Sequence, residues 1–448
     1  MAETDSPEAK LLNKLFHDLN DSGLSYAVMR NYDSLPSSAG SSDLDMLIDP
    51  GQEKLVVECI ENSIKNADGV IIGRVSTAGL LKIFALGKPD NVDDEWWGLR
   101  LDICIGVVYR GSCNLIDKSV WTEQIEDHNG ISVLSSDLAS VIGVMKELFH
   151  NGVIGERYID QASDASCNRW PEVSSALSPI GEKALARFRK ICQENINGAA
   201  ANLEARRLRR VVELKSLVIS PLSYVSNKIK YYGSKLLRLL YPPGKMIVFL
   251  GTDGAGKSTV IEAIKPALMD ATHKALSVKH FRPSLLPPLG RIKEKNYDSK
   301  QTVTDPHGAA PSGYLLSFAR LAYYFLDYAV GYWLLIRPIL SKSPTIVIFD
   351  RYAYDILLDP RRLRINLPQW VLRVFVSVIP KPDLIICLHG NPEVIAERKK
   401  ELPVNEVERQ VNALVAFSEN GKNRVLISTE STIVETRNHV LNSIKNVC

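Results

Sequence analysis

The residues with the most specific spacing lie in the stretch VFLGTDGAGKSTV, in the second half of the chain. Gly251, Gly256, Lys257 and Ser258 match G-x-x-x-x-G-K-[ST], between an apolar strand pattern and a helical pattern. The amides of such a loop and its helix N-terminus attract phosphate, the lysine spans the β and γ phosphates, and the hydroxyl suits Mg²⁺. We predict ATP and Mg²⁺ as cofactors, held by Gly251, Asp253, Gly254, Ala255, Gly256, Lys257, Ser258 and Thr259. A glycine-rich turn without a ligand is the alternative.

A second group of reactive residues lies in the first half, where SSDLDMLID is followed later by LRLDICI. These stretches resemble the nucleotidyltransferase (polymerase-β-like) fold, which implies that Asp43 and Asp45 project from one strand and Asp102 from a neighbouring strand. Alternate residues of a strand face one side. Converging carboxylates repel one another unless a cation joins them. The predicted metal ligands are therefore Asp43, Asp45 and Asp102, besides Ser258; a strand end in a polar turn is the alternative.

The first half departs from that family where its triphosphate is held. The family places a Gly-Ser pair on a helix before the first aspartate, and here that position reads MRNYDSLP. Arg30 and Asn31 are the candidate substitutes as phosphate ligands. Such a domain either transfers a nucleotidyl group or only binds a nucleotide.

The second half carries three further motifs beside GTDGAGKST, namely VKHFRP, TIVIFDRYAYD and PDLIICLHGNPEVIAERKKE. In this order the four are similar to those of the thymidylate kinase family of P-loop kinases, across 246–448. The resemblance implies that Arg282 contacts the acceptor phosphate, that Asp350 and Arg351 follow the third strand, and that Arg398 and Lys399 cover the phosphates.

Phosphoryl transfer needs cations around the transferred group, because its catalysis is mostly positioning and charge neutralisation. The predicted catalytic residues are Lys257, Asp350, Arg351, Arg282 and Arg398. Asp350 would hold the magnesium shell or orient the acceptor. A surface ion pair is the alternative for Asp350 and Arg351, and a solvated helix face is the alternative for Arg398.

Two features separate the second half from a compact mononucleotide kinase. The loop from Ser284 to Ser312 is long, and the helix after it is rich in aromatic residues. Asp355, Asp359, Arg361 and Arg362 add polar groups that suit a larger acceptor, such as a phosphorylated sugar or a glycan end. Divergent domains of this kind resemble those associated with bacterial surface-polysaccharide synthesis.

Length and composition predict a folded protein with more than one domain. The chain has 448 residues, 45% hydrophobic and 23% charged, which is enough for two domains of about 200 residues. Seven scattered cysteines without a CxxC pair argue against a disulfide framework or a zinc knuckle. The N-terminus has no signal-peptide pattern, so we expect a cytoplasmic protein.

The element pattern predicts an α/β protein. We expect an α+β nucleotidyltransferase-like domain at 1–135, a helical extension with a basic linker at 136–243, and a P-loop kinase-like domain with a parallel sheet at 244–448. The most apolar stretch, 314–340, contains Arg320 and Asp327, so it predicts a buried or surface-lying helix rather than a membrane span.

The segment 206–245 holds ten Lys and Arg residues and only one acidic residue, Glu213. Such a segment is usually a solvated helix face, and a peripheral contact with the inner membrane face is the alternative. Nucleic acid is not expected as a partner, and a dimer is compatible with the sequence.

Three functions follow from these features. The preferred one is an ATP-dependent phosphotransferase that acts on a nucleotide, phosphosugar or glycan acceptor and is fused to a nucleotidyltransferase-like domain. The second is a plain dTMP kinase with an inactive first domain. The third is a P-loop ATPase switch or a nucleic-acid-binding module.

Overall fold

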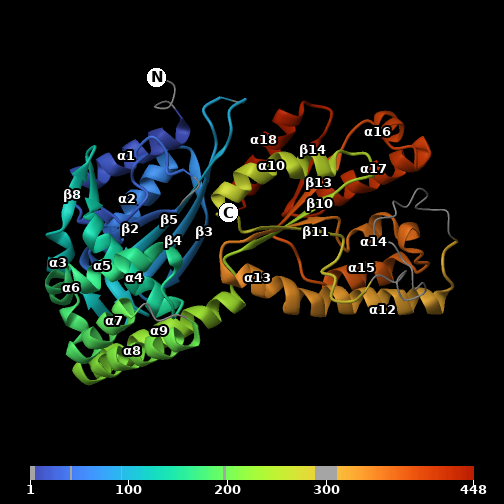
Figure 1. Cartoon of the computed structure of the whole chain (residues 1–448). Helices are drawn as coiled ribbons and strands as arrows, with labels where there is room; N and C mark the ends of the chain where they lie inside the picture. The colour runs from blue at the N-terminus through green and yellow to red at the C-terminus, as the bar shows by residue number, and fades with distance from the viewer. Residues whose placement is uncertain (1–5, 41–42, 92, 195–197, 288–309, 448) are drawn as a thin grey trace. The chain divides into compact units, whose positions relative to one another are not determined.

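The computed structural model describes residues 6–40, 43–91, 93–194, 198–287 and 310–447 (Figure 1). These residues form two compact units. The first unit comprises Met1–Ala85 and Leu99–Leu237, and the second comprises Leu86–Gly98 and Arg238–Cys448. The division therefore falls at 237/238 rather than at the predicted 243/244, and a short segment from the first half groups with the second unit. Most of the long loop predicted from Ser284 to Ser312 lies outside the described residues.

A seven-stranded mixed sheet organises the first unit, in the order β3-β4-β5-β2-β1-β9-β8. The strands β2 and β5 run parallel, and β1 runs antiparallel to β2. The strands of this half are β1 (Tyr26–Val28), β2 (Leu44–Ile48), β3 (Gly69–Thr77), β4 (Leu80–Gly87), β5 (Trp97–Ile105), β8 (Ile125–His128) and β9 (Ile131–Leu134), with a separate pair of β6 (Val107–Tyr109) and β7 (Cys113–Ile116).

The helices that follow the sheet share its core. Leu47 and Cys104 of the sheet belong to one buried cluster with Val141, Phe188 and Leu208. The predicted extension at 136–243 is thus largely part of the first unit. The helices are α1 (Pro7–Asp21), α2 (Glu53–Asn66), α3 (Lys118–Thr122), α4 (Ser136–His150), α5 (Ile159–Cys167), α6 (Trp170–Ala176), α7 (Glu182–Gln193), α8 (Gly198–Ile219) and α9 (Pro221–Leu240), with short turns at Pro50–Gln52, Glu156–Tyr158 and Ser178–Ile180.

Five parallel strands form the sheet of the second unit, in the order β11-β12-β10-β13-β14. The apolar residues of the three central strands, β12, β10 and β13, are buried on both faces, as a parallel sheet between helices requires. This confirms an α/β fold with a parallel sheet for this half. The strands are β10 (Lys245–Leu250), β11 (Leu276–His280), β12 (Ile346–Asp350), β13 (Leu384–His389) and β14 (Arg424–Ser428).

Helices cover both faces of this sheet (Figure 1). Helices α10 and α18 pack together on one face, and α12 and α15 lie on the other. Within the segment that groups here from the first half, the Trp96 indole donates to Asn438 of α18 at 3.0 Å. The helices are α10 (Lys257–Ala271), α12 (Tyr314–Gly331), α13 (Arg337–Lys342), α14 (Asp355–Leu358), α15 (Gln369–Val378), α16 (Pro392–Arg398), α17 (Val404–Glu419) and α18 (Ile433–Lys445), with single turns at Tyr332–Ile336 and Pro360–Leu363.

The apolar stretch 314–340 forms α12, a π-helical turn and α13. Asp327 is fully buried within it. Over the described part of the chain, no helix combines the length and the apolar character that a membrane crossing needs.

Candidate active site

The topology of the second unit places the glycine-rich loop where α/β sheets bind ligands. Strand β10 lies between β12 and β13, and the chain builds one side of the sheet before it crosses to the other. In such sheets a ligand site forms beyond the carboxyl ends of the strands, where the strand order reverses. The stretch from Gly251 to Gly256 leaves β10 at this edge and leads into α10.

Two glycines give the loop its curvature. Gly254 and Gly256 have φ angles of 90° and 80°, in the region that favours glycine. A Cβ atom on Gly254 would lie 2.9 Å from the carbonyl oxygen of Ile395. Gly256 is the N-cap of α10, so the N-terminus of this helix directly follows the loop. This is the arrangement that binds phosphate.

Lys257 is buried beneath this loop. Its ammonium donates to the carbonyl oxygens of Gly251 at 2.9 Å and Thr252 at 2.8 Å. Burial and the positive charge of Arg351 lower the pKa of Lys257 to about 8. The first turn of α10 thus holds a cation that loses its proton in mildly alkaline solution.

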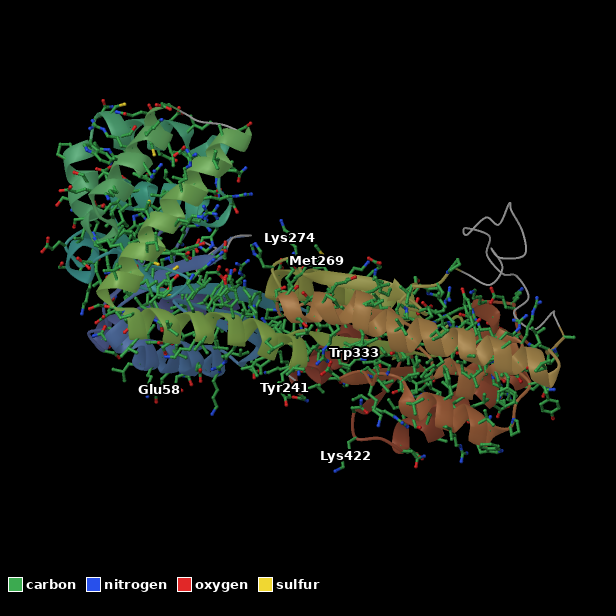
Figure 2. All side chains as sticks on the ribbon, turned by 90° about the horizontal axis from the view of Figure 1, so that it is seen from below. Glu58, Tyr241, Met269, Lys274, Trp333 and Lys422 are labelled. Atoms are coloured by element: carbon green, nitrogen blue, oxygen red, sulfur yellow. The ribbon has the colours of Figure 1, made fainter. Side chains whose placement is uncertain are left out.

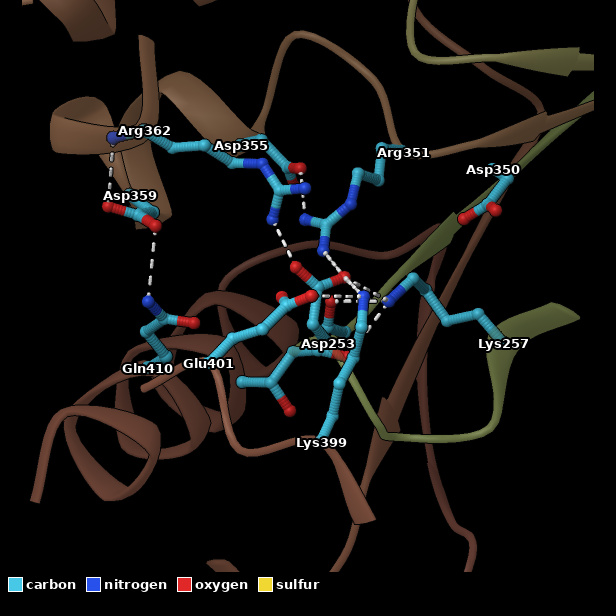
Figure 3. Close-up of polar contacts among 12 residues, drawn as sticks. Asp253, Lys257, Asp350, Arg351, Asp355, Asp359, Arg362, Lys399, Glu401 and Gln410 are labelled. Carbon is cyan, nitrogen blue, oxygen red and sulfur yellow. Dashed lines mark hydrogen bonds and ion pairs between the residues drawn. The ribbon is translucent and has the colours of Figure 1, made fainter. Parts of the chain in front are cut away.

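Asp253 is the centre of the polar network (Figure 3). Its carboxylate accepts hydrogen bonds from Arg351, at 2.5 Å, and from Arg362. The ammonium groups of Lys257 and Lys399 lie 4.0 and 3.9 Å away. Burial would raise the pKa of Asp253, but these cations hold it far below its ordinary value. The carboxylate is therefore ionised at neutral pH.

Arg351 joins two carboxylates. Beside its bond to Asp253, its guanidinium donates to Asp355 at 2.6 Å, and its backbone N–H donates to the carbonyl oxygen of Phe249. Burial opposes its charge, yet the two carboxylates raise the pKa of Arg351 above its ordinary value. Its position next to the loop is thus fixed from several sides.

Asp350 ends β12 and lies beside His280, whose Nδ1 is 3.6 Å from one carboxylate oxygen. Burial would raise the pKa of Asp350, but His280 and the charge of Lys257 bring it below its ordinary value. The other oxygen, Oδ1, is buried and accepts no hydrogen bond from the described residues. This oxygen and the exposed Ser258 are oxygen ligands of the kind that Mg²⁺ prefers, so the residues present fit the ion.

These groups surround a cavity of about 850 Å³. Its lining brings together five cations, Lys257, Arg351, Arg362, Arg398 and Lys399, with Asp350 and the loop. Four further polar residues that the sequence does not predict also line it, namely Glu401, Thr429, Ser431 and Thr436. Thr429 directly follows β14, so the carboxyl end of that strand was the available signal.

Arg282 is absent from the described lining of this cavity. Its guanidinium is buried, 2.9 Å from the carboxylate of Asp327 in α12, and lies near the rings of Tyr323 and Tyr324. The structure thus brings together Lys257, Asp350, Arg351 and Arg398, but it does not bring Arg282 to them.

In the first unit, the carboxylates of Asp43, Asp45 and Asp102 lie together, with ligand atoms within 4.8 Å of one another. The parallel pairing of β2 and β5 places Asp45 directly beside Asp102. Carboxylate oxygens at this spacing fit a hard divalent cation.

Basic side chains already contact this cluster. Arg30 donates to Asp45, and Arg100 lies 3.2 Å from Asp43 and 2.7 Å from Asp102. Burial would raise the pKa of Asp102, but hydrogen bonds from Arg100 and the charge of nearby Lys82 lower it. For Asp45, burial dominates and its pKa is raised. These basic side chains therefore offset part of the repulsion among the three carboxylates, which was the reason to predict a metal there.

The cluster opens into a cavity of about 620 Å³. Lys82, Arg100 and Lys146 line it together with the predicted Arg30, whereas Asn31 is absent from its described lining. Arg100 lies two residues before Asp102 on β5, so the alternation of a strand places both on one face, and Lys82 lies on the neighbouring β4.

The sequence matches no protein-family model and no curated protein. Among solved structures, the chain is similar to a thymidylate kinase from Ehrlichia chaffeensis, with 14% identity over 45% of this chain and 98% of that chain and a TM-score of 0.32. It is also similar to a thymidylate kinase from Candida albicans, with 17% identity over 45% of this chain and 92% of that chain and a TM-score of 0.31.

Proposed function

We propose that the second unit is an ATP-dependent phosphotransferase. The observation that supports this most is the convergence of five cations, Asp350 and a curved glycine-rich loop on one cavity at the carboxyl edge of a parallel sheet. Charge neutralisation of this kind is what phosphoryl transfer requires.

The residues around the cavity have different roles, which follow from their positions. The amides of the loop and the N-terminus of α10 hold the phosphates, and Lys257 exchanges its bonds to Gly251 and Thr252 for phosphate oxygens. Mg²⁺, held through Ser258 and Asp350, would neutralise charge on the phosphates. The acceptor oxygen forms a bond to the γ phosphorus as the bond to the β–γ bridging oxygen breaks, and Arg351 and Arg398 face the charge that develops.

For the acceptor we propose a nucleotide, a phosphosugar or a glycan end, in bacterial surface-polysaccharide metabolism. A hydroxyl acceptor would give its proton to Asp350 or to water, whereas a phosphate acceptor needs no base at neutral pH. Asp355 and Arg362 are already paired within the network around Asp253. These two residues therefore support the acceptor site indirectly, and Arg398 and Thr429 are the better candidates for contact with it.

A second candidate function concerns the first unit. We infer a nucleotidyltransferase-like site there, because Asp43, Asp45 and Asp102 share one cavity with Arg30 and Lys146. The carboxylates would hold Mg²⁺ and the basic side chains would contact a triphosphate. Isothermal titration of Mg²⁺ with the wild type and with Asp45→Asn measures this binding directly.

A screen with γ-labelled ATP tests the phosphotransferase. The acceptors are dTMP, phosphosugars and lipid-linked glycans, and the proteins are the wild type, Lys257→Ala and Asp43→Ala. We expect transfer that Lys257→Ala abolishes and Asp43→Ala leaves intact. Transfer to dTMP alone favours the plain kinase, and transfer that persists without Lys257 contradicts the proposal. ATP hydrolysis without an acceptor, together with salt-dependent nucleic-acid binding, would favour the ATPase module.

A further inference from the structure

The basic segment 206–245 falls on two helices with different surroundings. Helix α8 buries Ala205, Leu208 and Val212 in the core of the first unit. Two of its basic side chains contact other parts of that unit, because Arg209 donates to the carbonyl oxygen of Phe149 and Lys215 donates to that of Pro179. In α9, by contrast, no residue is buried. Part of the charge of α8 thus stabilises the first unit, whereas the side chains of α9 lie on the surface.

Helix α9 presents an exposed apolar face. Large side chains recur every third or fourth position, which places them on one side of a helix. They define the α9 stripe, which consists of Leu222, Val225, Ile229, Tyr232 and Leu236. Leu222 is 86% exposed, and Val218 and Ile219 at the end of α8 are 80% and 66% exposed. Exposed apolar residues that form a continuous row usually mark an interaction site.

Only positive charge flanks the α9 stripe. The sequence contains no Asp or Glu between Glu213 and Asp253. Lys230 and Lys235 are exposed, and the Lys235 ammonium lies 4.4 Å from the ring centre of Tyr231. Tyr241, just beyond the helix, is 77% exposed and projects from the ribbon in Figure 2. Leu and Ile on one face with Lys and Tyr at its border is the composition of a helix that lies in a membrane interface.

We propose that the α9 stripe, with Val218 and Ile219, binds the surface of a bilayer that contains anionic phospholipid. The apolar side chains would enter the acyl boundary, and Lys230 and Lys235 would contact the headgroups. This binding is independent of the phosphotransferase reaction, because α9 contributes nothing to either described cavity lining except Tyr231.

The composition of α9 favours an anionic bilayer over a second copy of the helix or a nucleic acid. Two copies of α9 packed on each other would bring ammonium groups together without an acid on the helix to pair with them. Nucleic acid would engage the lysines but would leave the apolar face in water. Helix α12 also exposes apolar residues, such as Leu315 and Phe318, but among its residues only Arg320 is basic, and this guanidinium donates to the carbonyl oxygen of Leu363.

Flotation of the full chain with vesicles tests the proposal. One set of vesicles is phosphatidylcholine mixed with phosphatidylglycerol, and the other is phosphatidylcholine alone. The variants are Ile229→Glu with Leu236→Glu, and Lys230→Gln with Lys235→Gln. The surface control, Lys54→Glu with Leu55→Glu, changes an exposed pair on α2.

We expect binding to the anionic vesicles that falls at high salt. The lysine variant should bind about 25-fold more weakly, since each basic residue near such a surface contributes about fivefold. The stripe variant should lose binding by about tenfold or more, and the control should bind like the wild type. Unchanged circular dichroism shows that the variants fold.

Three results would overturn the proposal. The first is equal vesicle binding by the wild type and the stripe variant. The second is a dimer in light scattering that Ile229→Glu with Leu236→Glu converts to a monomer while vesicle binding is absent. The third is binding to duplex DNA that the lysine variant loses and the stripe variant keeps, again without binding to vesicles.

Discussion

The carboxylate of Asp253 contacts two arginines, a role that the sequence did not predict for it. It lies inside the glycine-rich loop, where the sequence predicted contact with the nucleotide, yet its carboxylate holds Arg351 and Arg362. Arg362 is 109 residues away along the chain. Spacing in the sequence predicts groups on one loop or one helix, but it does not predict which distant strand ends meet, so this partnership could not be predicted.

Replacing Asp253 by Asn should destabilise the second unit. The change leaves Arg362 and one donor of the buried Arg351 without a charged partner, and breaking such a buried pair costs about 3 kcal/mol. Urea unfolding followed by fluorescence measures the free energy. Glu262→Gln is the control, because Glu262 pairs with Lys265 on the surface of α10 and should change stability little. Equal stability of Asp253→Asn and the wild type would contradict the structural role.

Nucleotide affinity should fall as the pH rises through about 8. Lys257 has a pKa of about 8 in the folded protein and 10.5 as its ordinary value, and only the ammonium attracts phosphate. Between these two values the folded state binds fewer protons than the unfolded state, so this lysine makes folding more favourable as the pH rises. Affinity and stability should therefore change in opposite directions. Titration with a fluorescent ATP analogue across this range tests the first, and constant affinity would contradict it.

At the scale of elements, the second unit was predictable in type and order. Its strands are apolar runs between helical patterns, and the glycine-rich loop marks the connection from β10 to α10. The order of the strands in the sheet depends on which strands pair, and the sequence of a single strand does not determine its neighbours. Arg282 shows the consequence, since the end of β11 leads its side chain to Asp327 of α12 rather than to the cavity.

Gly254→Ala tests whether the bend of the loop is required. The φ angle of 90° strains any residue with a Cβ atom, and that atom would lie 2.9 Å from the Ile395 carbonyl oxygen. We expect a loss of about 1–3 kcal/mol in the free energy of unfolding, with weaker ATP binding. Gly313→Ala is the control, because none of the described atoms lies within 4 Å of the added Cβ there. Calorimetric titration measures binding, and wild-type affinity in Gly254→Ala would show that the bend is dispensable.

At the scale of the whole molecule, each unit has its own sheet and its own cavity. The number of domains could be predicted from length, because one core does not serve 448 residues. The grouping of Leu86–Gly98 with the second unit could not, since its anchor is the contact of Trp96 with Asn438, 342 residues away.

Separate cores predict two unfolding transitions, and ATP bound at the glycine-rich loop should raise the one that belongs to the second unit. At a hundredfold excess over Kd, a ligand stabilises the fold that binds it by about 2.7 kcal/mol. For a unit of this size that is a shift of about 5–10 °C in Tm. Scanning calorimetry with and without ATP and Mg²⁺ measures both transitions, and Lys257→Ala is the control in which the shift of the second unit's transition should vanish. A single transition that moves as a whole would mean that the two units unfold together, and the phosphate site would then stabilise the entire chain.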